Sequence, residues 1–156
     1  MVRWRNDPRV VNNFLHRKPV TREDHLNWLR TKVDAGLVDQ LVVYEKGAGA
    51  GDEERMEAGR PIGCVYLRDI DHDARTCEYG VFIGEADALG KGYGNAIADW
   101  AVWYAREVLK LDTMVLRVLK GNEPAYKSYL RAGYVATETI PDYVDGRDLI
   151  MMERKL

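Results

Sequence analysis

The sequence predicts an α/β (α+β) fold, in which helices pack on a mixed, mostly antiparallel sheet. Several strand-like segments precede residue 84 with only short turns between them, which is typical of antiparallel hairpins. A glycine-rich loop then leads from a strand into a long amphipathic helix, and another strand and helix follow. The chain closes on two strand-like segments joined by Asp145-Gly146, a dipeptide typical of two-residue hairpin turns.

Length and composition fit one domain over residues 1–156, with 46% hydrophobic residues to build a single core. No apolar run approaches the roughly 20 residues of a membrane span, and no secretory leader is recognisable, so we expect a cytoplasmic protein without a membrane partner. Cys64 and Cys77 lie in predicted strands without metal-ligand spacing, which favours buried free thiols. The three histidines are scattered, so no metal site is expected.

Charge is distributed unevenly around a formal net value of −2. A basic segment usually forms a solvated helix face, but it can also attract an anionic small molecule. The acidic overall balance argues against nucleic acid as a partner. The basic residues that crowd the first part of the chain are Arg3, Arg5, Arg9, Arg17, Lys18, Arg22, Arg30 and Lys32.

The first half of the chain predicts two helices followed by three strands. A helix is expected over residues 2–15, and a capping box from Thr21 to Asp24 opens a second helix that Gly36 closes. Strands are expected over 40–45, 61–68 and 78–83. Residues 46–60 are expected to form a flexible hairpin loop. The turn over 69–74 holds Asp71-His72-Asp73, which we interpret as a solvated turn rather than a metal site.

The second half predicts a helix over 96–109, a strand over 113–119, a helix capped by Asn122 and ended by Gly133, and a hairpin of 134–140 with 147–154. We expect packing in the core or at an interface, rather than ligand contact, for Trp100, Trp103 and Tyr104. One face of the first of these helices is expected to be buried, through Ile97, Ala101, Ala105 and Val108.

The glycine-rich loop is the strongest functional signal in the chain. Gly90, Gly92 and Gly94 alternate where a helix begins, so several backbone N–H groups can turn toward one anion, aided by the helix dipole. Alternating glycines also make simple tight turns, which is the competing interpretation. No Walker sequence follows, and the antiparallel strand order does not fit a dinucleotide fold.

Two segments carry a resemblance to a known family. Leu89-Gly90-Lys91-Gly92-Tyr93-Gly94 resembles the pyrophosphate loop of the GNAT superfamily of acetyl-CoA-dependent N-acetyltransferases, and the segment from Asn122 to Tyr134 resembles that family's Asn-x-x-Ala-x-x-x-Tyr-x-x-x-Gly-aromatic pattern. The resemblance implies the GNAT fold, with a splayed strand pair and helices on both faces of the sheet. Two departures are Leu89, where the family usually has Gln or Arg, and a chain that begins almost at the first helix, where the family usually has an edge strand.

Acetyl transfer needs a base for the amine, donors for the acetyl carbonyl and an acid for the leaving thiolate. Glu78 opens the strand beside the loop and is the candidate base, with a strand-end carboxylate as the alternative. The resemblance places Tyr129 at the general acid. The cofactor-binding residues that we expect for acetyl-CoA, partly on the resemblance, are Val81, Phe82, Ile83, Leu89, Gly90, Lys91, Gly92, Tyr93, Gly94, Asn95, Asn122 and Ser128.

The acceptor amine has one lead, in the N-terminal part. Trp4-Arg5-Asn6-Asp7-Pro8 and Glu23-Asp24-His25-Leu26 are similar to the amino-sugar-nucleotide N-acetyltransferases of pseudaminic-acid biosynthesis, which would place Arg5 and His25 beside a nucleotide or its diphosphate. Alternatives are acetylation of a protein N-terminus, as in the related ribosomal-protein branch, or of another small amine such as a polyamine. A non-catalytic CoA-binding module is a third reading, and either a monomer or a homodimer is compatible with the sequence.

Overall fold

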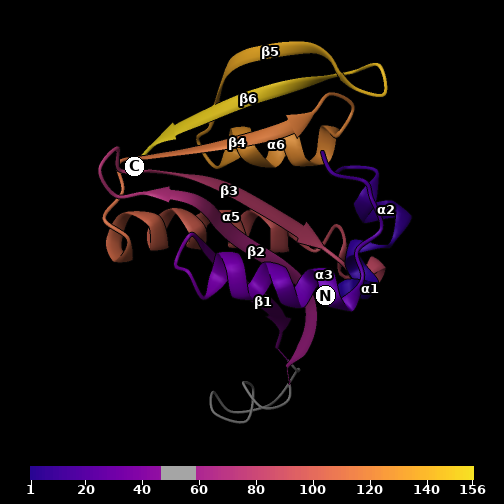
Figure 1. Ribbon diagram of the computed structural model, residues 1–156. Coiled ribbons are helices and arrows are strands. Elements are labelled where there is room, and N and C mark those ends of the chain that lie inside the picture. Colours follow the sequence, from indigo (N-terminus) through magenta and orange to yellow (C-terminus); the bar gives the residue numbers. More distant parts are fainter. Residues whose placement is uncertain (47–58) are drawn as a thin grey trace.

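The computed structural model describes residues 1–46 and 59–156, and it contains a six-stranded sheet in the order β1-β2-β3-β4-β6-β5 (Figure 1). Neighbouring strands are antiparallel except for the parallel pair β3 and β4. The mixed, mostly antiparallel sheet predicted from the sequence is therefore confirmed. The strands are β1 (Val38–Glu45), β2 (Arg60–Asp71), β3 (Thr76–Ile83), β4 (Thr113–Leu119), β5 (Val135–Val144) and β6 (Arg147–Lys155).

Helices cover both faces of this sheet, with α3 and α5 on opposite sides of it (Figure 1). Two of the helices end in a π-helical turn, η1 after α3 and η3 after α5. The helical elements are α1 (Val2–Arg5), α2 (Pro8–Val11), α3 (Arg22–Trp28), η1 (Leu29–Val33), the 3₁₀ turn η2 (Ala86–Ala88), α5 (Tyr93–Trp103), η3 (Tyr104–Val108) and α6 (Glu123–Arg131).

The single helix predicted over residues 2–15 is wrong, because the chain breaks into α1 and α2. Asp7 has an extended backbone, with φ −71° and ψ 125°, as the residue before a proline prefers. Its side chain accepts a hydrogen bond from the Arg9 amide and caps α2. The predicted capping box is confirmed: Thr21 and Asp24 exchange side-chain-to-backbone hydrogen bonds at the start of α3.

Two apolar clusters lie on opposite faces of β2 and β3. Cys64 packs with Trp4, Val10 and Phe82 beneath α1 and α2, whereas its neighbour Val65 faces the larger cluster beneath α5 and α6. This alternation shows that the central strands are buried on both faces. Both cysteines are buried and free, as predicted.

The observed helices differ from the predicted ones in several details. The helix after the glycine loop begins at Tyr93 rather than Ala96, and Val108 is 49% exposed, because the π turn rotates it off the buried face. Trp103 is also exposed, whereas Trp100 stacks on Tyr104 at 5.0 Å. Asn122 occupies the cap position of α6 but makes no side-chain capping bond.

The predicted turns hold where they are described. Gly36 and Gly133 end their helices with φ of +71° and +82°, and the final hairpin turns through Asp145 and Gly146, both with positive φ. The predicted loop over 46–60 falls largely on residues 47–58, outside the described residues. Within the described ranges no strand precedes β1 at its edge of the sheet, no metal-binding cluster is found at residues 69–74 or elsewhere, and no helix is long and apolar enough to cross a membrane.

The strands that position the site are β3 and β4. They pair only through Thr76 with Thr113, Cys77 with Met114 and Glu78 with Val115, and then diverge (Figure 1). Beyond Glu78, β3 keeps its pairing with β2 as far as Ile83. Backbone groups of β3 that point toward β4 therefore have no strand partner there, and the sheet opens into a cleft.

Candidate active site

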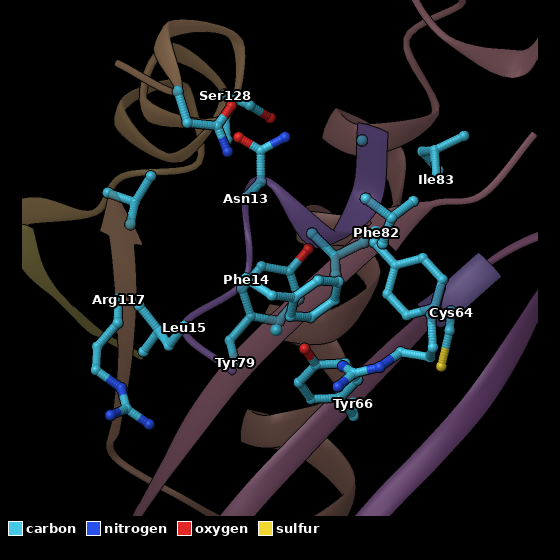
Figure 2. A pocket seen from close by; sticks show the side chains of 18 of the residues that line it. Asn13, Phe14, Leu15, Cys64, Tyr66, Tyr79, Phe82, Ile83, Arg117 and Ser128 are labelled. Atoms are coloured by element: carbon cyan, nitrogen blue, oxygen red, sulfur yellow. The ribbon is translucent and has the colours of Figure 1, made fainter. Parts of the chain in front are cut away.

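A cleft of about 1020 Å³ occupies this opening and runs from the glycine-rich loop to the N-terminal helices. Figure 2 shows its centre, where the rings of Phe14, Tyr66, Tyr79 and Phe82 gather, with Arg117 to one side. All but one of the predicted site residues line it; those that do are Arg5, His25, Glu78, Val81, Phe82, Ile83, Leu89, Gly90, Gly92, Tyr93, Gly94, Asn95, Asn122, Ser128 and Tyr129. The exception is Lys91, whose ammonium group instead pairs with Glu45 at 3.0 Å.

One end of the cleft lies at the glycine-rich loop, where the sequence predicts coenzyme binding, and we call it the coenzyme end. It is built from main-chain groups. Gly90 and Gly92 have φ of +75° and +85°, in the left-handed region where a side chain would strain the loop. No acceptor in the described parts of the chain takes a hydrogen bond from the amides of residues 90–94. These amides lie at the N-terminus of the 11-residue helix α5, so donors and helix dipole converge on one point.

Helix α6 closes the other side of this end. Ser128 donates a hydrogen bond to the Asn95 side chain at 2.7 Å and so links α6 to the first turn of α5. A Cβ on Gly94 would lie 3.8 Å from the Ser128 hydroxyl, an ordinary contact. A loop of unbonded amides at a helix N-terminus suits a phosphate group.

Tyr129 lies on α6 where the coenzyme end meets the centre of the cleft. It is 8% exposed and makes edge-to-face contact with Tyr79 at 6.0 Å. Burial raises the pKa of Tyr129 well above its ordinary value, so its phenol stays protonated at neutral pH and can donate a proton or a hydrogen bond. The neighbouring Tyr79 hydroxyl is buried without a hydrogen-bond partner in the described residues.

Glu78 lies at the last position where β3 pairs with β4, between two guanidinium groups. Arg117 of β4 binds it bidentately, with Nε 3.0 Å from Oε1 and a terminal nitrogen 2.9 Å from Oε2. Arg68 of β2 donates a further hydrogen bond to Oε1. A carboxylate has about four acceptor positions, so these three bonds leave one on Oε2.

The opposite end of the cleft, where the sequence predicts the acceptor, is formed by the N-terminal helices, and we call it the acceptor end. The Arg5 guanidinium lies 4.2 Å from the centre of the Phe14 ring, which itself packs edge-to-face on Phe82. His25 stacks on Trp28 with ring centres 6.2 Å apart. Burial lowers the pKa of His25, and repulsion from the N-terminal amine and Arg5 lowers it further, so this imidazole is neutral at pH 7.

Helix α1 is anchored against the end of β3. The Trp4 indole N–H donates to Glu85 at 2.7 Å, and Arg3 pairs with the same carboxylate. A Cβ on Gly84 would lie 2.2 Å from the Trp4 ring, so only glycine permits this approach. The contact between Trp4 and Glu85, which anchors the helix that carries Arg5, joins residues about eighty positions apart in the sequence.

The lining residues that sequence reasoning missed include Phe14, Tyr66, Arg68 and Arg117. Arg117 carries a usable signal, since it is a charged residue within the otherwise apolar part of β4, whereas Arg68 lies beside Asp69 near the end of β2. A charge in such a strand needs a partner, which here is Glu78. The two aromatic residues carry no comparable signal, because an aromatic residue in a strand or helix usually packs in a core.

Comparison with known proteins agrees with this geometry. Residues 1–135 match the model of an acetyltransferase (GNAT) domain. The chain is 26% identical to an acetyltransferase of Campylobacter jejuni named PseH over 141 residues, which cover 90% of this chain and 78% of the relative.

Solved structures agree on the fold. A spermidine N-acetyltransferase from Vibrio cholerae, in complex with CoA and spermine, matches with a TM-score of 0.84 at 18% identity, over 99% of this chain and 86% of that one. A domain from Methanocaldococcus jannaschii matches with a TM-score of 0.79 at 17% identity, over 99% and 89% of the two chains. The chain therefore belongs to the GNAT acetyltransferases, enzymes that use acetyl-CoA to acetylate amines.

Proposed function

We propose that this enzyme transfers the acetyl group of acetyl-CoA to a primary amine on a nucleotide-linked amino sugar, by direct attack in a ternary complex. The observation that carries the acceptor class is the charge of the cleft. Among described residues, seven Arg and Lys side chains line it against three Asp and Glu. Such a lining attracts a diphosphate and repels a polyamine, which is itself positively charged. The similarity of residues 4–8 and 23–26 to amino-sugar-nucleotide acetyltransferases supports the same class.

The coenzyme is proposed to bind at the glycine-rich loop. The free amides of Gly90 to Gly94 would hold its diphosphate, and Leu89 contributes only its backbone and an apolar surface. Asn122 and Ser128, on the α6 side, would contact the pantetheine arm. The arm would then follow the opening beside Val81, Phe82 and Ile83, where the backbone N–H groups that point away from β2 would polarise the acetyl carbonyl.

Glu78 is proposed as the general base. An amine must be neutral to attack, and an alkylamine has a pKa of roughly 10, so one proton has to leave before the C–N bond forms. The unoccupied acceptor position on Oε2 can take that proton, directly or through one water. Arg68 and Arg117 then act as positioning residues, since they fix the carboxylate beside the splay.

Tyr129 is proposed as the general acid. The attack forms the C–N bond, and collapse of the tetrahedral intermediate breaks the C–S bond. The Tyr129 phenol would hydrogen-bond the departing sulfur and deliver the proton that converts the thiolate of CoA into a thiol. A phenol with a raised pKa favours transfer late in C–S cleavage, when the sulfur is most basic.

The decisive experiment is a panel of amines incubated with acetyl-CoA, with release of CoA thiol as the readout. UDP-4-amino sugars are expected to react, whereas spermidine and a peptide with a free N-terminus are not. Reaction with spermidine alone would overturn the acceptor class. The variants Glu78→Gln and Tyr129→Phe are expected to bind CoA and lose rate, which separates an enzyme from a CoA-binding module.

A further inference from the structure

The glycine-rich loop is tied to the sheet through one carboxylate. Glu45, the last residue of β1, accepts hydrogen bonds from the Tyr93 hydroxyl at 2.6 Å and from the Lys91 ammonium at 3.0 Å. Its second oxygen accepts from Arg60 of β2 at 2.8 Å. Arg60 in turn pairs with Asp87 at 2.9 Å, just before the loop. We call this set of five residues the Glu45 clasp.

The clasp lies outside the cleft except for Tyr93. Glu45, Arg60, Asp87 and Lys91 do not line it. The Lys91 ammonium is thus turned away from the position where a diphosphate would lie, and the clasp as a whole carries two positive and two negative groups. Its contribution to coenzyme binding is therefore one of geometry rather than of added positive charge.

A glycine-rich loop needs such an anchor. Glycine has more backbone freedom to lose than any other residue, so ordering this loop only when the coenzyme arrives would weaken binding. Apart from their chain neighbours, no atom of the described residues lies within 4 Å of where a Cβ on Gly90 or Gly92 would be, so side chains of these residues do not pack against the loop there. Leu89 is 54% exposed, so its side chain does not pack the loop against the sheet either.

We propose that Glu45 is a positioning residue that pre-forms the coenzyme cradle by fixing both ends of the loop to β1 and β2. The proposal rests on the proposed function, because it takes residues 90–94 as the diphosphate site. It also assigns Lys91 a structural role: its side chain holds the loop through Glu45 and does not bind phosphate.

Calorimetric titration with CoA tests the proposal directly. Glu45→Ala is expected to weaken CoA binding roughly tenfold, which is the effect of losing a modest amount of preorganisation. Tyr93→Phe removes a single donor to Glu45 and is expected to weaken binding less. Glu107→Ala is the matched control, since Glu107 is also a surface carboxylate with two ion pairs but lies at the end of η3; it is expected to leave CoA binding unchanged.

A double-mutant cycle identifies the role of Lys91. If Lys91 acts through Glu45, Lys91→Met weakens binding and the double variant with Glu45→Ala is no weaker than the weaker single variant. NMR order parameters of the amides at 90–94, without CoA, are expected to fall in Glu45→Ala and not in Glu107→Ala. This readout detects loss of loop order even where the variant still folds.

Each outcome separates the two claims. If the unaltered protein does not bind CoA, the proposed function fails. If it binds, and Glu45→Ala binds CoA equally well or more tightly, only the clasp is overturned. Additive losses from Glu45→Ala and Lys91→Met would also overturn it, because Lys91 would then contact phosphate independently.

Discussion

The two ends of the cleft are built by different means. The coenzyme end offers backbone amides of one continuous segment, residues 90–94, at the start of α5. The acceptor end is assembled from side chains of α1, α3, β2, β3 and β4, which meet through contacts such as Trp4 with Glu85 and Arg117 with Glu78. A backbone site depends on the path of its loop, whereas a side-chain site changes with each substitution. We therefore expect proteins with this architecture to share the coenzyme and to differ in the acceptor.

The largest expected effect comes from Tyr129, where the two ends meet. Tyr129→Phe removes the phenol and is expected to lower kcat by about 10²-fold or more, since an acid or base contributes 10²–10⁴-fold. CoA affinity is expected to stay within about threefold, because the backbone donors are untouched. Initial rates of thiol release give kcat, and calorimetric titration gives the CoA affinity.

Tyr79→Phe is the matched control for that variant. The Tyr79 hydroxyl is buried and unpartnered in the described residues, and its ring lies 6.0 Å from that of Tyr129. Removing it is expected to leave the rate unchanged. A loss confined to Tyr79→Phe would move the acid role to that residue.

A smaller effect is expected from the ion pair that holds the candidate base. Arg117→Lys keeps the charge but loses the bidentate geometry, so Glu78 is less well fixed. We expect kcat to fall about tenfold with little change in CoA affinity, as positioning errors reduce rate more than binding. An unchanged kcat would exclude Arg117 from this role.

The same contrast explains how much the sequence alone could predict. The hairpins, the glycine loop and the helix after Asn122 follow from local patterns, and all are found. The break before Pro8 was missed because apolar spacing outweighed the proline rule, and the exposure of Val108 was missed because a π turn shifts the helix face. Arg68 and Arg117 lie 49 residues apart in the sequence. Both reach Glu78 because β3 lies between β2 and β4 in the sheet.

The free energy of unfolding tests how α1, at the acceptor end, is attached to the rest of the protein. Gly84→Ala places a Cβ 2.2 Å from the Trp4 ring, so α1 must move. Overpacking of this kind costs about 1–3 kcal/mol in the free energy of unfolding. Chemical denaturation measures it, and the KM for the acceptor is expected to rise while CoA affinity is retained.

Gly36→Ala is the comparison for that variant. Its Cβ would meet nothing within 4 Å, but its φ of +71° is unfavourable for alanine, so a loss of about 1 kcal/mol is expected from backbone strain alone. Equal losses from both variants, with acceptor KM unchanged, would contradict an anchoring role for the contact between Gly84 and Trp4.

The smallest effect is expected from the protonation of His25 at the acceptor end. Its pKa in the folded protein is lowered from 6.5, chiefly by burial, so the unfolded chain binds this proton first as the pH falls. The stability that neutral His25 contributes is therefore present above pH 6.5 and is lost as the pH falls through the folded pKa. In thermal melts from pH 7.5 to 5, the melting temperature should fall less for His25→Gln than for the unaltered chain. His72→Gln, a change in an exposed turn, is the control and should show no such difference. An equal loss in all three proteins would show that the acceptor end does not disfavour the imidazolium.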